Sequence, residues 1–415
     1  MQVDLERFLG NCSCGHTHDI SVQAIYIEPK ASRYLSELLQ PYKCPVFICD
    51  SNTKKATEEI LGEYFEKNKV IELSEKGIHA DNFHVAYLSE RVEKEADILI
   101  AVGAGTIHDL TRYIAFEKEI PFISMPTAAS VDGFVSTVAA MTWKEMKKTF
   151  PSKAPIFVLA DTDIFSKAPY RLTASGISDL MGKYTALADW KISHILTDEY
   201  FCDTIYNLEM EAVREVEDIL GEIKLGNEEC MEKLMYALLL SGLAMQMIGN
   251  SRPASGAEHH ISHLWEMNVI NEPIDALHGE KVSVGLIMCL EKYEKILYAI
   301  ESSNCQVIDN AEFETSLLKD TFGRRGLYEG ILEENGENLL EVINLNQLKN
   351  QLPEIAAQLK KLPKSNEMKE KLKKADCLTS MQDLNLPDIK ELTLTLSPYV
   401  RRRLTLVRIS KLLRI

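Results

Sequence analysis

The chain lacks any hydrophobic run long enough to span a membrane, and its N-terminal residues, MQVDLERFLG, lack the basic start and apolar stretch of a secretory signal. Low-complexity tracts are absent too, and the 46% hydrophobic and 26% charged residues are typical of folded proteins. These absences predict a cytoplasmic protein that does not insert into membranes.

A surplus of basic residues is also lacking, because 62 Asp and Glu residues outnumber 46 Lys and Arg residues and give a formal net charge of -16. Such a surface repels polyanions, so we expect no nucleic-acid partner. The sequence has no disulfide framework either. Its nine cysteines are odd in number and scattered, which indicates reduced thiols in a reducing compartment.

With 415 residues, the chain is long enough for two domains. Through about residue 165, short β-rich runs alternate with amphipathic stretches, which is typical of a parallel sheet flanked by helices. We therefore predict an α/β, Rossmann-like nucleotide-binding domain over residues 1–165 and an all-α, metal-binding domain over residues 166–415. The predicted strands are 24–27, 45–50, 69–73, 97–103, 121–125 and 156–161, a helix passes through Val85, Leu88 and Val92, and the later helices include 177–196, 230–249 and 280–300.

The last residues, RRRLTLVRISKLLRI, are basic and amphipathic, as in a helix on a membrane surface. In a chain this acidic, we instead interpret them as a final helix that packs its Leu and Ile residues on the body and projects its Arg residues outward.

Two loops after predicted strands are candidates for nucleotide binding. One strand ends in Gly103, Ala104 and Gly105, and a helical pattern begins at Thr106. Glycines there let backbone N–H groups approach a pyrophosphate at a helix N-terminus, although the full G-x-G-x-x-G pattern is missing and the turn can serve geometry alone. The second loop, PTAASVDGF over 126–134, follows another strand, at the position where open α/β sheets bind ligands. Together the two loops predict one nucleotide site.

Asp50 ends the predicted strand PVFICD. A carboxylate there can bind the adenosine ribose diol and repel a 2′-phosphate, which favours NAD over NADP. Asp50 can equally serve as the cap of the following helix. The sequence therefore leaves open whether Asp50 binds the ribose or caps the helix.

Three histidines crowd one predicted helical turn in SRPASGAEHHISHLWEM, and His278 follows closely. His259 and His263 would share a helix face as i and i+4, whereas His260 would point elsewhere. This crowding favours a functional site over chance burial. Catalytic zinc-type sites use three His or carboxylate ligands and keep one open position, and His259 and His278 supply two of them.

The residues alone do not fix the third ligand. Asp179, in GISDLMGKY, stands at the expected start of a helix and is more readily explained as a cap or as a partner of Lys183. The early segment CSCGHTHD suggests a second metal site through Cys12, Cys14, His16 and His18. Because its spacing fits no standard zinc pattern, we interpret it as a structural or dimer-contact segment.

The motifs resemble, in their order along the chain, the signatures of the iron-dependent alcohol dehydrogenase and dehydroquinate synthase superfamily: GAGTIHDLTRY, PTAASVDGFVS, ASGISDLMGKYTALADW, SRPASGAEHHISHLWEM and LHGEKVSVG. Within this superfamily, SRPASG and the double histidine resemble the sn-glycerol-1-phosphate dehydrogenases. Ala104 departs from the pattern, because the family's loop often has a third glycine there.

This resemblance implies a homodimer in which Asp179, His259 and His278 hold one divalent metal ion. Nickel, zinc or iron suits such mixed ligation. It also implies catalysis by His263 and Asp179, with Asp132, Asp179 and His263 facing the substrate. The expected NAD(P)H-binding residues, with NADH favoured through Asp50, are Asp50, Gly105, Thr106, Ile107, His108, Asp109, Thr127, Ala128, Ala129, Ser130 and Ser136.

The implied reaction is reversible reduction of dihydroxyacetone phosphate at C2 to sn-glycerol 1-phosphate, which would feed glycerophospholipid and ether-lipid synthesis. A metal would polarise the carbonyl and His263 would relay the proton. Lys183 and Arg252 are candidates for phosphate contact, and both can equally be ordinary ion-pair residues. The alternatives are a dehydrogenase for glycerol or another polyol, and a non-catalytic nucleotide- or metal-sensing protein.

Overall fold

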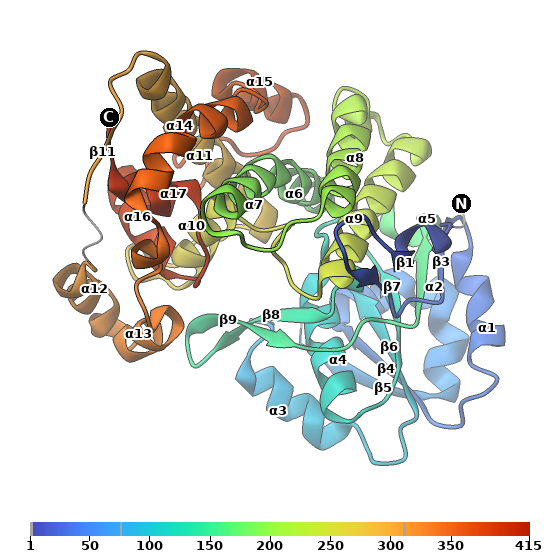
Figure 1. Ribbon diagram of the computed structural model, residues 1–415. Helices are drawn as coiled ribbons and strands as arrows, with labels where there is room; N and C mark the ends of the chain where they lie inside the picture. Colours follow the sequence, from blue (N-terminus) through green and yellow to red (C-terminus); the bar gives the residue numbers. More distant parts are fainter. Residues whose placement is uncertain (1–2, 75–76, 310–312) are drawn as a thin grey trace. The chain divides into compact units, whose positions relative to one another are not determined.

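The computed structural model describes residues 3–74, 77–309 and 313–415 (Figure 1). The chain forms two compact units. Unit 1 comprises Met1–Leu180 and Glu211–Ser251, and unit 2 comprises Met181–Met210 and Arg252–Ile415.

Unit 1 contains a six-stranded sheet in which every neighbouring pair is parallel. Its strands match the predicted ones to within one residue at each end. The α/β expectation for the N-terminal part is therefore confirmed. In spatial order the strands are β3 (Ala24–Glu28), β10 (Phe157–Asp161), β7 (Phe122–Pro126), β6 (Ile98–Gly103), β4 (Pro45–Asp50) and β5 (Lys69–Leu73).

Alternation along β4 shows how the sheet is buried. Val46 and Ile48 join a core with helices α3 (Asn82–Arg91) and α4 (Gly105–Glu117), whereas Phe47 and Cys49 join a core with α2 (Ser51–Lys67). Because successive side chains of a strand point to opposite faces, both faces of the sheet are covered. The predicted helix through Val85 and Leu88 is confirmed as α3, and Val92 follows it as the C-cap.

Unit 1 also contains a second sheet and several further helices. An antiparallel hairpin of β8 (Val138–Trp143) and β9 (Met146–Pro151), which the sequence did not predict, lies between β7 and β10 along the chain. The helices are α1 (Leu35–Leu38), α5 (Thr162–Phe165), α6 (Tyr170–Met181) and α9 (Glu228–Ile248), and α8 (Asp203–Ile219) is divided between the units. The predicted single helix over 177–196 is two helices, because α6 ends before Gly182 and α7 begins after it.

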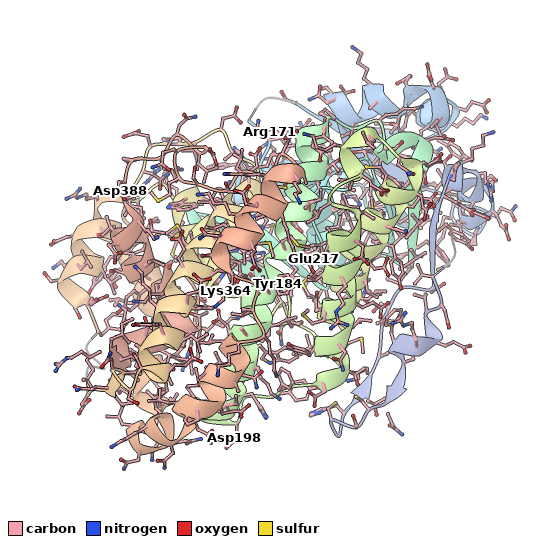
Figure 2. All side chains as sticks on the ribbon, turned by 90° about the horizontal axis from the view of Figure 1, so that it is seen from above. Arg171, Tyr184, Asp198, Glu217, Lys364 and Asp388 are labelled. Atoms are coloured by element: carbon pink, nitrogen blue, oxygen red, sulfur yellow. The ribbon has the colours of Figure 1, made fainter. Side chains whose placement is uncertain are left out.

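Unit 2 is largely helical, as expected, apart from the short antiparallel pair β11 (Gln306–Val307) and β12 (Leu413–Arg414). Asp198, labelled in Figure 2, ends α7 in the left-handed conformation with φ of 55°. The shared core draws apolar side chains from α7, α10, α11, α14 and the C-terminal residues. The helices are α7 (Lys183–Thr197), α10 (Ala257–Glu266), α11 (His278–Glu301), α12 (Thr315–Phe322), α13 (Tyr328–Asn335), α14 (Leu345–Leu359), α15 (Ser365–Lys374), α16 (Lys390–Leu396) and α17 (Leu406–Ile409).

The C-terminal residues differ from the predicted outward-facing helix. Leu406, Ile409 and Leu412 are buried as expected. Arg408 is only 1% exposed, however, and donates to the Pro398 carbonyl and the Asn335 side-chain oxygen, both at 3.1 Å. The expectation of projecting arginines is wrong here, because a buried guanidinium that finds several carbonyl acceptors can remain in the interior.

Within the described ranges, none of the helices combines the length and the apolar character that a membrane crossing requires.

Candidate active site

The carboxyl ends of β4, β6 and β7 lie at one edge of the unit 1 sheet, because these adjacent strands are parallel. Gly103 ends β6 and Pro126 ends β7, opposite each other in register. The Thr127 N–H donates to the Gly103 carbonyl at 3.0 Å, which ties the two following loops together. The structure therefore brings both predicted nucleotide loops to one edge, as sheet ligand sites require.

The first loop leads directly into the N-terminus of α4. The first helical hydrogen bond runs from His108 N–H to the Ala104 carbonyl at 3.2 Å. The N–H groups of Gly105, Thr106 and Ile107 come before His108 in the chain, so the helix itself provides no acceptor for them. Such groups, with the positive end of the helix dipole, suit a phosphate. A Cβ at Gly103 would lie 2.5 Å from the Ile107 side chain, so only glycine allows this tight turn.

Two of the predicted cofactor residues also have structural roles. Asp50 caps α2, since its Oδ1 accepts the N–H groups of Asn52 and Thr53 at 2.9 and 3.0 Å, which confirms the capping alternative. The His108 side chain is fully buried, with Nδ1 3.0 Å from the Ala104 carbonyl and Nε2 2.8 Å from the Ser124 hydroxyl. Burial lowers the pKa of His108 to about 3. Contacts of either residue with a nucleotide remain predictions.

Asp179 lies near the C-terminal end of α6. The expected position at a helix start is wrong, because this helix already begins at Tyr170. Its Oδ2 accepts the Asp132 N–H at 3.1 Å, and Asp132 Oδ2 in turn accepts the Ser241 hydroxyl at 2.9 Å. Both carboxylates are buried. Unit 1 thus places two of the predicted substrate-facing residues side by side.

Hydrogen bonds from α4 and α6 hold the loop that follows β7. Arg112, buried on α4, donates to the carbonyls of Ser136 and Gly133, and the Ser175 hydroxyl of α6 donates to the Ser130 carbonyl at 3.2 Å. Ser136 Oγ accepts the Val138 N–H at 3.1 Å. The predicted Ser130 and Ser136 therefore lie on a rigid loop, which favours a preformed site.

In unit 2, His259 lies on α10 with its ring oriented by a buried carboxylate. Its Nδ1 is 2.8 Å from Glu258 Oε1. Glu258 also accepts the Thr185 hydroxyl at 2.6 Å and the Gly256 N–H at 2.7 Å. Burial acts to raise the pKa of Glu258, but these hydrogen bonds outweigh it and hold the pKa below its ordinary value. With Nδ1 donating to Glu258, His259 directs its Nε2 lone pair away from Glu258.

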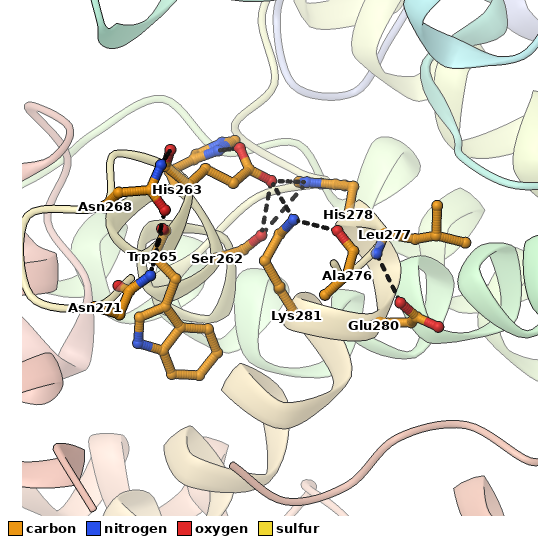
Figure 3. A network of polar contacts seen from close by, with 11 residues as sticks. Ser262, His263, Trp265, Asn268, Asn271, Ala276, Leu277, His278, Glu280 and Lys281 are labelled. Carbon is orange, nitrogen blue, oxygen red and sulfur yellow. Dashed lines mark hydrogen bonds and ion pairs between the residues drawn. The ribbon is translucent and has the colours of Figure 1, made fainter. Parts of the chain in front are cut away.

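A second carboxylate orients His263 and His278 (Figure 3). Glu266 Oε2 is 3.3 Å from His263 Nδ1, and its Oε1 is 3.2 Å from His278 Nδ1. His278, the first residue of α11, has its ring centroid 5.2 Å from that of His259 and 5.5 Å from that of His263. Burial lowers the pKa of His263 to about 3, and Glu266 opposes this shift. The helical prediction for His259 and His263 is confirmed.

This donor set fits a divalent cation. Histidines that bind metals almost always donate their other ring N–H to a carboxylate, and both His259 and His278 do so here. Glu266 is less suited as a ligand, because Lys281 Nζ lies 3.3 Å from the same carboxylate and offsets its charge. The pattern points to Nε2 of His259 and of His278 as metal-binding atoms.

The neighbouring His260 lies in a different environment. It is fully buried, and within the described residues neither ring nitrogen has a hydrogen-bond partner. Burial lowers its pKa well below the ordinary value, and the charges of Arg403, Arg401 and Arg252 add to this effect. His260 is thus a neutral side chain in a positively charged environment.

Two of these arginines, Arg252 and Arg401, differ in their ion-pair and hydrogen-bond partners. Arg252 forms an ion pair with both oxygens of Glu199, at 2.8 and 3.0 Å, and donates to the Leu404 carbonyl at 2.8 Å, so the ion-pair alternative is confirmed for it. Arg401 is half-buried, and its Nη2 has no hydrogen-bond partner among the described residues. Burial lowers its pKa, and Glu334 and Glu266 oppose this.

The sequence reasoning did not identify Glu266 or Arg401. Glu266 follows His263 by three residues on α10, so helical spacing was a usable signal for it. Arg401 has no such local signal, because more than a hundred residues separate it from the histidines.

Comparison with known proteins identifies the family. Residues 26–169 match the model of the iron-containing alcohol dehydrogenases. A glycerol-1-phosphate dehydrogenase [NAD(P)+] of Geobacillus thermodenitrificans is 36% identical over 301 residues, which cover 70% of this chain and 74% of the relative. The corresponding protein of Pyrococcus horikoshii is 38% identical over 236 residues, covering 56% and 67%.

Solved structures agree on the fold. An archaeal alcohol dehydrogenase from a Red Sea brine pool matches with a TM-score of 0.63 at 17% identity, over 92% of each chain. Glycerol dehydrogenase of Schizosaccharomyces pombe matches with a TM-score of 0.54 at 19% identity, over 85% of this chain and 93% of that one. The chain is therefore an NAD(P)-linked oxidoreductase of the iron-containing alcohol dehydrogenase family and belongs with its glycerol-1-phosphate dehydrogenases.

Proposed function

We propose that the protein catalyses the reversible NAD(P)H-dependent reduction of dihydroxyacetone phosphate to sn-glycerol 1-phosphate. One divalent ion of nickel, zinc or iron would be held by Asp179, His259 and His278. The observation that carries the proposal is the pair of imidazoles on α10 and α11 whose Nδ1 atoms each face a carboxylate, Glu258 or Glu266. The substrate is proposed from the names of the relatives, which are glycerol-1-phosphate dehydrogenases.

Each group has a defined task in this reaction. When bound, the cation supplies Lewis-acid stabilisation of the developing alkoxide and the nicotinamide supplies the hydride. Asp132 and Asp179, joined by a hydrogen bond in unit 1, orient the substrate hydroxyls. During oxidation, Nε2 of His263, whose Nδ1 is held by Glu266, would accept the proton of the C2 hydroxyl and pass it to water, and during reduction it would relay a proton from water to the C2 oxygen.

The cofactor is expected at the sheet edge of unit 1. The N–H groups of Gly105, Thr106 and Ile107 face a pyrophosphate there, with Asp109 and the loop Thr127–Ser130 alongside. We favour NADH, because the second carboxylate oxygen of Asp50 can accept from a ribose diol and repels a 2′-phosphate.

A chelation and restoration assay tests the proposal. Chelator-treated protein should oxidise NADH only after a divalent ion and dihydroxyacetone phosphate are both added, and chiral analysis should give sn-glycerol 1-phosphate. Faster turnover of dihydroxyacetone than of its phosphate would instead establish the polyol dehydrogenase alternative. The absence of NADH oxidation with nickel, zinc and iron would contradict the proposal altogether.

Arg401 is the candidate that the structure adds for the phosphate of the substrate. Besides burial, the positive charge of Arg401 lowers the pKa of His263, and Nη2 of Arg401 lacks a protein acceptor among the described residues. A phosphate oxygen would satisfy this nitrogen through a charge-assisted hydrogen bond. Arg252 already forms an ion pair with Glu199, so it fits this task less well, while Lys183 remains a candidate.

Replacing Arg401 by methionine is expected to raise KM for dihydroxyacetone phosphate by roughly 10- to 100-fold, as loss of a charged hydrogen bond costs about 1.5–3 kcal/mol. Turnover of unphosphorylated dihydroxyacetone should change little. Arg402→Met is the matched control, because Arg402 is exposed and pairs only loosely with Glu337 at 3.5 Å. Equal losses on both ketones in Arg401→Met would exclude the assignment.

We further propose that the enzyme acts as a homodimer in the cytoplasm and supplies glycerophospholipid or ether-lipid synthesis. Sedimentation of the purified protein tests the first point. Membership of a dehydrogenase family argues against the alternative of a non-catalytic sensor.

A further inference from the structure

The N-terminal segment CSCGHTH forms a small hairpin in unit 1 that the proposed reaction does not use. Its strands, β1 (Gly10–Asn11) and β2 (Thr17–His18), are two residues long and antiparallel. In the turn, Cys12 N–H donates to the His16 carbonyl at 2.9 Å and Gly15 N–H to the Cys12 carbonyl at 3.0 Å. Strands this short are not stable alone, so something else must hold the hairpin.

The hairpin brings two thiols and one imidazole together. The ligand atoms of Cys12, Cys14 and His18 all lie within 4.8 Å of one another, and Cys14 Sγ is 3.4 Å from His18 Nε2. A tetrahedral zinc ion with ordinary bond lengths would set a sulfur and a nitrogen ligand about 3.6 Å apart. The observed separation therefore fits ligands that share one ion.

The orientation of His18 supports the same conclusion. This side chain is only 4% exposed, and its Nδ1 is 3.0 Å from the Met247 carbonyl. A carbonyl can only accept, so Nδ1 carries the hydrogen and Nε2 presents a lone pair toward Cys14. Metal-binding histidines are fixed in this way by a backbone carbonyl or a carboxylate.

The strand register explains why the spacing resembles no standard zinc pattern. Gly10 pairs with His18 and Asn11 with Thr17, so the chain folds back and places His18 beside the turn that carries both cysteines. Zinc fingers take their histidines from a helix instead. His16, the fourth residue suggested by the sequence, is exposed and is not part of this group.

We propose that Cys12, Cys14 and His18 bind a zinc ion that stabilises the N-terminal hairpin, with one further ligand from outside the hairpin. Two soft thiolates together with an imidazole select zinc over magnesium or calcium, which prefer oxygen ligands. This site shares no residue with the proposed catalytic site. It also differs in chemistry, because the proposed catalytic ligands contain no sulfur, so the two sites can be tested separately.

Cobalt substitution of the full-length, reduced protein tests this site independently of activity. Thiolate ligands give Co²⁺ a near-ultraviolet charge-transfer band, which a carboxylate and imidazole site does not produce. We expect this band in the wild type and its loss on adding one equivalent of zinc. Cys12→Ser and Cys14→Ser should each weaken it at least twofold and the double variant should abolish it, whereas Ser13→Ala, in the same turn, and His278→Ala should retain it. Absence of the band in the wild type would overturn the proposal.

Alkylation of the unmodified protein covers the case in which the serine variants fail to fold. Cys12 and Cys14 should react at least tenfold faster with iodoacetamide after chelation, while the exposed Cys44 should react equally in both samples. Equal rates for Cys12 and Cys14 with and without chelator, or a disulfide between them in the freshly purified protein, would overturn the zinc site.

Discussion

Replacing His278 by alanine is expected to remove the catalytic metal ion and to lower kcat/KM by roughly a thousandfold, which corresponds to about 4 kcal/mol. The reason lies in how the imidazole is held. Its Nδ1 lies 3.2 Å from Glu266, which aims Nε2 away from this carboxylate as a metal ligand. The measurements are the metal content of the purified variant and steady-state kinetics with dihydroxyacetone phosphate.

His194→Gln provides the matched control for loss of one histidine from unit 2. His194 lies on α7, where its Nδ1 contacts the Glu199 carbonyl at 2.7 Å. This variant should keep its metal and at least half of the wild-type rate. If His278→Ala retained both metal and activity, the proposed ligand set would be wrong. Retained metal with lost activity would instead make His278 a substrate-binding residue.

A pH-dependent loss of stability is expected from His108. Burial lowers its pKa to about 3, whereas an unfolded chain has the ordinary histidine pKa near 6.5. The unfolded state therefore binds a proton more readily below pH 6.5, so the stabilisation is complete above this pH and declines as the pH falls toward 3. The expected loss is about 1.4 kcal/mol for each pH unit below 6.5.

Thermal unfolding of the wild type and of His108→Gln at several values between pH 4.5 and 7 measures this contribution. The variant should be less stable at pH 7, because it loses packing in the core, but its stability should fall less steeply with acid. His84→Gln, which removes a partly exposed histidine of α3, controls for loss of one imidazole from unit 1. Parallel curves for His108→Gln and the wild type would contradict the prediction.

Most of the sheet could be predicted because its signals are local. The apolar run of β6 is buried along its whole length, and the alternation in β4 divides its side chains between two cores. The hairpin of β8 and β9 was missed, because β9 carries the polar run Lys147–Thr149 and lacks the apolar run that marks a buried strand. Pairing between strands, not periodicity, stabilises such a hairpin.

The site was predicted unevenly for a similar reason. His259 and His263 followed from helical spacing on α10, and the Asp50 cap followed from its place before α2. The inward position of Arg408 and the proximity of Arg401 to His263 depend on contacts between distant segments, which no local pattern contains.

By itself, the sequence determined the fold class, the two glycine- and alanine-rich loops and the histidine cluster, because strand alternation, turn chemistry and helical spacing act over a few residues. Only the tertiary structure decided which partner each side chain has. It joined Asp179 to Asp132, placed Glu266 between two histidines, and folded Cys12, Cys14 and His18 together. Such contacts depend on chain segments that meet only when burial of the cores brings them together, so they follow from packing and not from local propensity.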